Sequence, residues 1–251
     1  MIRISAVIIA FNEEKKIARC IESLIPVADE IVVVDSFSTD KTVEICGRLG
    51  AKIIQHPFAN YIEQKNYALD CITHPWALSL DADEALSTEL QQSILSVKPS
   101  PLAEGYFMNR LTRYCNRWIK HAGWYPDRKL RLFIRNKAQW KGVNPHDKIE
   151  MQRGTKVMHL SGDLLHYSFD SHEEYVNQQK RFAAISAKHL HELGKNINMP
   201  GAYGKSVFRF LKEYFLKTGF LEGRAGLKIC GTSAAATFEK YKLLHELNKK
   251  K

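Results

Sequence analysis

Residues 76–84 read Trp-Ala-Leu-Ser-Leu-Asp-Ala-Asp-Glu, and the rest of the sequence is organised around this stretch. Residues 76–80 have the apolar character of a short buried strand, and Asp81, Asp83 and Glu84 follow at once. Ligands of open α/β sheets bind at the carboxyl ends of the strands. Two carboxylates separated by one residue can bind Mg²⁺ or Mn²⁺, while water and a diphosphate fill the other coordination positions of the ion. The alternative interpretation is an acidic turn that caps the following helix.

Alternating strand and helix patterns lead up to this stretch. The expected strands are residues 4–10, 31–34 and 52–55, and the expected helices are 12–26, 39–50, 60–72 and, after the stretch, 86–97. Asn12 is a good N-cap for the first helix, and Thr39 or Asp40 can cap the second. Strands and helices that alternate at this spacing predict right-handed crossovers and a parallel sheet.

The composition of the sequence changes after the break at Pro99-Ser100-Pro101. Strand patterns at 105–114 and 130–135 lie in an aromatic and arginine-rich setting, and we expect them to extend the sheet. The remaining pattern predicts a helix at 175–193, a loop at 194–204 rich in Gly, Asn and Pro, and a helix at 205–221.

The chain of 251 residues is long enough for a full core, and its net charge of +10 is unevenly distributed. Residues 1–100 contain 9 Lys and Arg against 14 Asp and Glu, residues 101–200 contain 17 against 9, and residues 201–251 contain 11 against 4. This asymmetry suits a protein that binds a metal diphosphate with its acidic part and an anionic surface with its basic part. Membrane phospholipid and nucleic acid are the two candidate anions that the basic part would bind.

The cysteines and the N-terminus indicate the compartment. Five scattered cysteines without a Cys-x-x-Cys pair favour the reducing cytoplasm. The N-terminus lacks the zones of a signal peptide, and no apolar run reaches the roughly 18 residues that span a bilayer. We therefore expect a cytoplasmic protein, soluble or peripheral on the inner face of the cytoplasmic membrane.

The helix expected at 205–221 has an unusual composition. Lys205, Arg209 and Lys212 form a basic stripe beside a wide apolar surface, made of Val207, Phe208, Phe210, Leu211, Tyr214, Phe215 and Leu216. Such a helix can lie in a membrane interface, or it can pack on the body of the protein with its lysines in water. The sequence leaves both possibilities open.

Polar side chains follow three of the predicted parallel strands. Asn12 and Glu13 come after the first, Asp35 after the second, and the pair Asp81 and Asp83 after the fourth. A carboxylate such as Asp35 can accept hydrogen bonds from uracil or ribose, and Asp83 can reach phosphate oxygens through a metal. The sequence lacks the glycine-rich motifs of dinucleotide-binding and P-loop proteins. A diphosphate would therefore have to be bound by side chains and a metal.

These segments resemble a known family. Residues 7–14 (VIIAFNEE), 32–42 (VVVDSFSTDKT) and 81–84 (DADE) look like family 2 glycosyltransferases of the GT-A fold, with a mostly parallel sheet flanked by helices. The resemblance continues through residues 123–128 (GWYPDR), 130–133 (LRLF), 144–147 (NPHD) and 165–168 (LHYS). This longer pattern is similar to lipopolysaccharide-core β-1,4-glucosyltransferases.

The resemblance implies roles for individual residues. Donor binding would involve Ala10, Asn12, Glu13, Asp35, Lys65, Asn66, Asp81, Ala82 and Asp83. Asp83 would bind the divalent metal, Mn²⁺ or Mg²⁺, with Asp81 and His166 as further candidate ligands. Asp147 would be the catalytic base, although the usual family pattern there is His-Glu and this chain has His146-Asp147. The candidate acceptor or diphosphate contacts are Trp124, Tyr125, Arg128, Arg131 and His146.

The resemblance also implies a division of the chain and an activity. Residues 1–100 would bind the nucleotide sugar, residues 101–200 would form the acceptor side of the same domain, and residues 201–251 would be a basic helical extension. The implied activity is inverting transfer of a hexose from a UDP-sugar to a lipid-linked glycan, a lipopolysaccharide or a capsule precursor. Two alternatives remain: a sugar-nucleotide nucleotidyltransferase, and a non-catalytic basic adaptor for membrane or nucleic acid.

Overall fold

The computed structural model describes residues 1–143 and 146–249, without the side chains of Val143 and His146. The chain forms two compact units, which we call the sheet unit and the helical unit. The sheet unit comprises residues 1–110 and 127–167, and the helical unit comprises residues 111–126 and those from 168 onward. The sequence-based division at residues 100 and 200 concerns function and stays a prediction.

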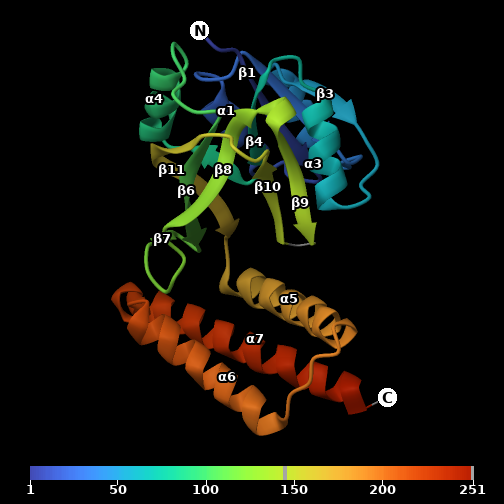
Figure 1. Cartoon of the computed structure of the whole chain (residues 1–251), viewed down its shortest axis with the longest axis vertical. Coiled ribbons are helices and arrows are strands. Elements are labelled where there is room, and N and C mark those ends of the chain that lie inside the picture. The colour runs from blue at the N-terminus through green and yellow to red at the C-terminus, as the bar shows by residue number, and fades with distance from the viewer. Residues whose placement is uncertain (144–145, 250–251) are drawn as a thin grey trace. The chain divides into compact units, whose positions relative to one another are not determined.

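The first half of the sheet is parallel, as the alternating pattern predicts. Its order is β3-β2-β1-β4, and its strands are β1 (Ile4–Ala10), β2 (Glu30–Asp35), β3 (Lys52–Gln55) and β4 (Trp76–Asp81). The connecting helices are α1 (Ile17–Leu24), α2 (Thr42–Arg48) and α3 (Tyr61–Asp70) (Figure 1). Ala10 pairs with Asp35, and Ile9 pairs with Asp81. The carboxyl ends of three strands therefore lie side by side.

The second half of the chain extends the sheet with antiparallel pairs. The order continues from β4 through β8 (Asp127–Ile134), β6 (Gly105–Tyr114), β11 (Val157–Phe169) and β5 (Glu84–Leu86), while β7 (Arg117–Ile119) pairs with β6. The helix α4 (Thr88–Val97) follows β5, and β9 (Ala138–Val143) and β10 (His146–Met151) form a separate antiparallel sheet. The predicted α/β class, with a sheet flanked by helices, is confirmed.

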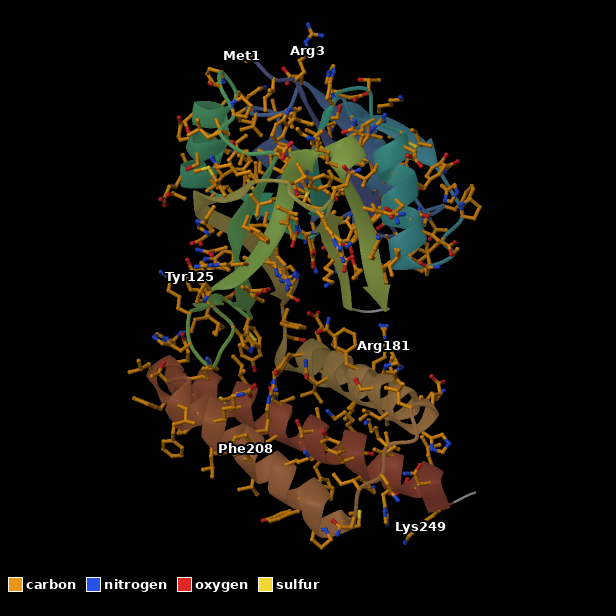
Figure 2. All side chains as sticks on the ribbon, in the orientation of Figure 1. Met1, Arg3, Tyr125, Arg181, Phe208 and Lys249 are labelled. Atoms are coloured by element: carbon orange, nitrogen blue, oxygen red, sulfur yellow. The ribbon has the colours of Figure 1, made fainter. Side chains whose placement is uncertain are left out.

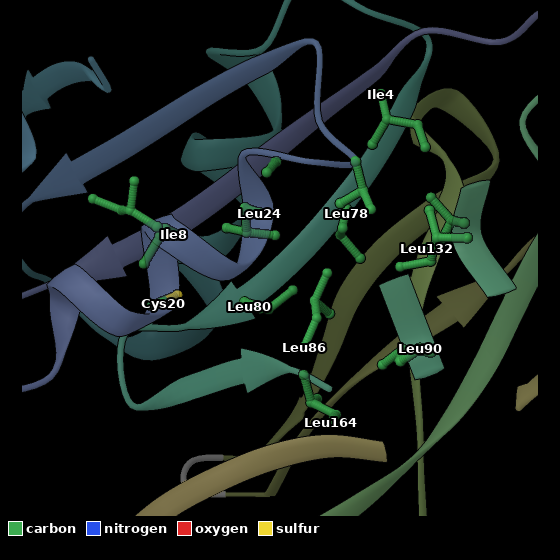
Figure 3. Packing of buried hydrophobic residues seen from close by; sticks show 14 of the residues in the cluster. Ile4, Ile8, Cys20, Leu24, Leu78, Leu80, Leu86, Leu90, Leu132 and Leu164 are labelled. Atoms are coloured by element: carbon green, nitrogen blue, oxygen red, sulfur yellow. The ribbon is translucent and has the colours of Figure 1, made fainter. Parts of the chain in front are cut away.

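Buried apolar residues cover both faces of the sheet. On one face, Ile8, Leu78 and Leu80 pack with side chains of α1 and α4, including Leu24 and Leu90 (Figure 3). On the other face, residues of α3 and β9 pack against the intervening positions of the same strands. Strands buried on both faces need continuous apolar runs, and the sequence of β1 and β2 has them.

The start of the first helix differs from the prediction. Asn12 has a φ of 54°, and α1 begins at Ile17 without a side-chain cap. The reason is that the Oδ1 of Asn12 accepts a hydrogen bond of 2.8 Å from the backbone N–H of Thr39. Asn12 therefore joins two strand-end loops, and the prediction that it caps a helix was wrong.

Other element boundaries also differ from the prediction. The helix expected from Leu86 begins at Thr88, because residues 84–86 pair with β11 as strand β5 and Ser87 caps α4. The expected loop at 194–204 already contains the start of α6 (Met199–Leu211). Proline is compatible with the first turn of a helix, so Pro200 does not indicate a loop here.

In its residues up to 249, the helical unit contains three long helices and two short irregular turns. These are α5 (His172–Glu192), α6, the π-helical turn η2 (Lys212–Leu216), the 3₁₀ turn η3 (Gly219–Glu222) and α7 (Gly223–Lys249). Both α5 and α6 pack against α7. The side chains of Tyr114, Phe169, Tyr175 and Ile229 form the core of this unit. The predicted helical extension is confirmed, although the single helix expected at 205–221 is divided after Leu211. Among the helices of residues 1–143 and 146–249, none is long and apolar enough to cross a bilayer.

Gly162 in β11 lies against the first turn of α4. It has a φ of 92°, and an added Cβ would lie 2.3 Å from the backbone N of Leu90. We expect Gly162→Ala to lower the free energy of unfolding by at least about 3 kcal/mol, because the clash adds to the strain of a positive φ. Gly154 is the matched control, since it has a φ of 83° with open space around it. Gly154→Ala should cost only about 1 kcal/mol in the same denaturant titration, and an equal loss for both would assign the whole effect to backbone strain.

Candidate active site

The loops after β1 and β2 are joined by hydrogen bonds. The backbone N–H of Asn12 donates to the hydroxyl of Ser38 (2.9 Å), and that of Glu13 donates to the hydroxyl of Thr42 (2.8 Å). The carboxylate of Asp35 is fully buried and accepts hydrogen bonds from the backbone N–H and the hydroxyl of Ser38. These contacts bring Asn12, Glu13 and Asp35 to one edge of the sheet.

Asp81, at the end of β4, is engaged by two cations. Its Oδ1 lies 2.9 Å from the Nζ of Lys65, and its Oδ2 lies 3.0 Å from the Nη2 of Arg131. Burial by itself would raise the pKa of Asp81, but these two cations outweigh it and hold that pKa far below its usual range. Asp81 is therefore a permanent anion whose oxygens both have partners.

Asp83 lies two residues further along and has a different partner. Its Oδ2 is 3.3 Å from the Nε2 of His166 in β11, and its backbone carbonyl accepts a hydrogen bond from the N–H of Tyr167 (2.8 Å). Burial raises the pKa of Asp83, and His166 more than offsets this effect, so the carboxyl stays ionised. The carboxylate is 23% exposed, which means that solvent reaches it. Burial and the charge of Asp83 together raise the pKa of Glu13.

Asp147 in β10 lies beside the end of β4 although it is 66 residues away from Asp81 in the sequence. The Nζ of Lys65 is 2.8 Å from the Oδ2 of Asp147, so one ammonium group joins Asp81 and Asp147. The same Nζ lies 4.2 Å from the centre of the Trp140 ring. The Asn66 side chain exchanges two hydrogen bonds of 3.0 Å with the backbone of Trp140. Neighbouring residues of α3 therefore hold the β9–β10 hairpin against the site.

Two residues that support the site were not identified from the sequence. Glu84 is fully buried and lies 2.7 Å from Arg131, which also contacts Asp81. Trp140 is buried beneath Lys65. The position of Glu84 directly after the Asp-x-Asp motif is a signal that could have identified it. Trp140 has no such signal, because nothing in its neighbourhood in the sequence relates it to Lys65.

The candidate acceptor and diphosphate contacts are distributed over both units. Arg131 is buried and paired with carboxylates, whereas Arg128 in β8 is exposed. Trp124 and Tyr125 belong to the helical unit (Figure 2 labels Tyr125). The centre of the Trp124 ring lies 5.5 Å from the centre of the Tyr175 ring. The side chain of His146 lies outside the described residues.

The divalent metal expected from the sequence needs side-chain ligands among the described residues. They contain no cluster of three or more His, Cys, Asp and Glu side chains arranged to hold an ion. Asp83 and His166 nevertheless offer one carboxylate oxygen and one imidazole nitrogen at adjacent positions. Mg²⁺ is commonly bound through one or two protein carboxylates together with water and substrate phosphates. The pair therefore fits an ion that a bound diphosphate would complete.

Residues 5–176 match the family model described as "Glycosyl transferase family 2", which is more than half of the chain. The chain belongs to this family. The enzyme class expected from the sequence, a glycosyltransferase, is thereby confirmed, and neither the nucleotidyltransferase nor the non-catalytic adaptor is supported.

Several curated relatives of this glycosyltransferase match over nearly its whole length. An uncharacterized glycosyltransferase of Rickettsia typhi is 33% identical, and the match covers 100% of this chain and 89% of the relative. The lipopolysaccharide core biosynthesis glycosyltransferase LpsC of Rhizobium meliloti is 27% identical, with 96% and 93% covered.

A solved structure shows a weaker likeness to this glycosyltransferase. It is the glucosyl-3-phosphoglycerate synthase of Mycobacterium tuberculosis in complex with Mn²⁺, UDP and glucosyl-3-phosphoglycerate. It is 22% identical with a TM-score of 0.38, and the match covers 45% of this chain and 44% of that chain.

Proposed function

We propose that this glycosyltransferase moves a hexose from a UDP-sugar to a hydroxyl of a lipid-linked glycan or of a lipopolysaccharide or capsule precursor, with inversion and with a divalent metal. The observation that carries the proposal is the set of carboxylates at one edge of the sheet. Asp35 and Asp81 end the two parallel strands that flank β1. Asp83 follows Asp81 with His166 beside it, and Lys65 joins Asp147 to Asp81.

Asp83 and His166 are the metal ligands in this proposal. A divalent ion bound there would neutralise charge on the departing diphosphate. Asp81 has a supporting role, because both of its oxygens already contact Lys65 and Arg131. The charge of Asp81 in turn keeps these two cations in place beside the diphosphate position.

The uridine end of the donor is assigned to the loops after β1 and β2, with contacts from Ala10, Asn12, Glu13 and Asp35. Because Asp35 is fully buried and already bonded to Ser38, its contribution would be made through the Ser38 loop, which it holds in place. Lys65, Asn66 and Ala82 are further donor-side residues, and Arg128 and Arg131 are cations for the diphosphate.

Asp147 is the base in this proposal. Inverting transfer needs a group that removes the proton of the attacking hydroxyl on the face opposite the leaving group. Asp147 is 12% exposed, and its contact with Lys65 places it near the Asp81–Asp83 turn. A base so placed contributes roughly 10² to 10⁴-fold to the rate.

The acceptor assignment is supported by the likeness to LpsC, whose name places that protein in lipopolysaccharide core biosynthesis. Trp124 and Tyr125 are the candidate stacking residues for an acceptor sugar, and His146 is a further candidate contact. An acceptor of this type is membrane-bound, so the enzyme would work as a peripheral protein at the inner face of the cytoplasmic membrane.

A donor screen tests the proposal. The purified protein is incubated with a panel of nucleotide sugars in Mn²⁺, and release of the nucleoside diphosphate is measured. We expect one UDP-hexose to be hydrolysed slowly without an acceptor, and chelation of the metal to stop the release. Turnover of a different nucleotide sugar, or unchanged turnover in excess chelator, would contradict the donor or the metal assignment.

Lys65 provides a test of the site's architecture that does not need a substrate. Lys65→Met removes a buried ammonium that contacts both Asp81 and Asp147. We expect the free energy of unfolding to fall by about 3 kcal/mol, because the two carboxylates lose a buried partner.

The matched control for Lys65 is Lys148 in β10, whose side chain is 69% exposed and pairs with Glu150. Lys148→Met should change the free energy of unfolding by less than about 0.5 kcal/mol in the same denaturant titration. Equal stabilities of the Lys65 and Lys148 variants would show that Lys65 does not hold the β9–β10 hairpin.

A further inference from the structure

The solvent-facing side of α6 and of the η2 turn is apolar. Six large apolar side chains along it, which we call the apolar face, are at least 39% exposed: Tyr203, Val207, Phe208, Leu211, Phe215 and Leu216. Phe208 and Leu216 are 62% and 75% exposed (Figure 2 labels Phe208 on α6). Contiguous exposed apolar groups of this size usually mark a binding surface.

The apolar face is not the side of α6 that packs in the core. Ala202 and Glu213 are buried, and the hydroxyl of Ser206 donates to the backbone carbonyl of Ala234 in α7 (2.7 Å). These three residues lie on the opposite side of the helix from Leu211 at 3.6 residues per turn. Because α6 already packs on α7 through that side, the apolar face is left for another partner.

The charges around the apolar face have one sign. Between Tyr203 and Lys228 the exposed charged residues are all basic: Lys205, Arg209, Lys212, Lys217, Arg224 and Lys228. The two acidic residues of this segment are buried and paired within the helical unit, Glu213 with Arg209 (2.5 Å) and Glu222 with His121 (2.7 Å). The surface therefore combines aromatic and aliphatic groups with a net positive charge.

We propose that the apolar face and its surrounding lysines form an interfacial anchor, which inserts into a bilayer that contains anionic phospholipid. Apolar side chains enter the acyl boundary, while the lysines reach phosphate groups at the headgroup level. A second copy of the chain is a poorer partner, because two copies packed through this face would bring like charges together. The inference rests on the proposed function in one respect, since a lipid-linked acceptor gives the enzyme a reason to be at the membrane.

The test uses sedimentation of the full-length protein with vesicles. We expect binding to phosphatidylcholine vesicles that contain phosphatidylglycerol, and much weaker binding to pure phosphatidylcholine. Lys205→Gln/Lys212→Gln/Lys217→Gln should weaken binding to the anionic vesicles by about a hundredfold, at roughly fivefold for each lysine. Phe208→Ser/Phe215→Ser/Leu216→Ser should weaken it at least about thirtyfold.

Matched controls come from α5 and its C-terminal end, outside the apolar face. Leu193 is 57% exposed, and Lys188 is an exposed lysine. Leu193→Ser and Lys188→Gln should each leave vesicle binding within about twofold of the wild type, since neither residue belongs to the surface. The single variant Phe208→Ser, expected to lose severalfold, replaces the triple variant if that protein does not fold.

Three results would overturn the proposal. The first is vesicle binding that the serine variant retains, and the second is equal binding to neutral and anionic vesicles. The third is a concentration-dependent dimer, seen by sedimentation velocity, that the serine variant abolishes, because it would assign the face to a second copy. Donor hydrolysis measured without vesicles reports the active site separately, so a failure of this inference is distinguishable from a failure of the proposed function.

Discussion

Replacing Asp83 by asparagine is expected to lower kcat/KM about a thousandfold and to abolish the stimulation of UDP binding by Mn²⁺. The carboxylate lies 3.3 Å from His166, whereas that of Asp81 is held between Lys65 and Arg131, so Asp83 is the group better placed to share an ion with a diphosphate. Asparagine keeps the shape and removes the charge, which weakens a hard-cation site most strongly. A thousandfold loss corresponds to ~4 kcal/mol of transition-state stabilisation, within the range of a Lewis-acid contribution. Steady-state kinetics and titration calorimetry with UDP, with and without Mn²⁺, measure both effects.

The control for this variant is Asp70→Asn, which neutralises an exposed carboxylate at the end of α3 in the same unit. It should leave kcat/KM and UDP binding within about twofold of the wild type. If Asp83→Asn still bound UDP with full metal stimulation, the metal would have to be held elsewhere.

Asp147→Asn is expected to lower kcat at least about a hundredfold while the affinity for UDP stays nearly unchanged. The amide cannot accept the proton of the attacking hydroxyl, but it has nearly the same shape as the carboxylate beside Lys65. An interaction made only in the transition state lowers kcat and leaves ground-state binding alone. Single-turnover kinetics with saturating donor and acceptor measure the change.

Two companion variants make this prediction sharper. Glu150→Gln alters a partly exposed carboxylate on the same strand as Asp147 and should keep normal turnover. Asp147→Glu restores a carboxylate with one more methylene group, as in the usual His-Glu pattern, and we expect it to recover part of the lost rate. Ordinary turnover in Asp147→Asn would remove this residue from the role of base.

Local sequence patterns predicted the parallel strands well. The β-branched runs at 4–10 and 52–55 are strands with those bounds, and the expected run at 31–34 is extended by one residue at each end. The runs at 4–10 and 31–34 were predictable because a strand buried on both faces needs an unbroken apolar run. The pairing of residues 84–86 with β11 was not predictable in this way, since the partner strand lies about 80 residues away in the sequence.

The helix boundaries show the same difference between local and distant causes. Asn60 caps α3 as its sequence context indicates, and its side chain accepts from the N–H of Glu63. Asn12 has equally good capping chemistry, but Thr39 takes its side-chain oxygen. A cap depends on neighbouring residues only when no distant donor competes for the oxygen.

The sequence by itself determined the family, the order of strands and helices in the first half of the chain, and the set of polar residues that end the parallel strands. It could do so because these properties depend on apolar periodicity and on motifs within a few adjacent residues. Only the tertiary structure decided how those polar residues are paired. Lys65, Arg131 and His166 come from three different elements, and they give the two aspartates different partners: Asp81 is held between two cations, whereas Asp83 lies beside an imidazole. The physical reason is that a buried carboxylate needs its counter-ion within a few ångströms, and folding sets those distances between residues far apart in the chain.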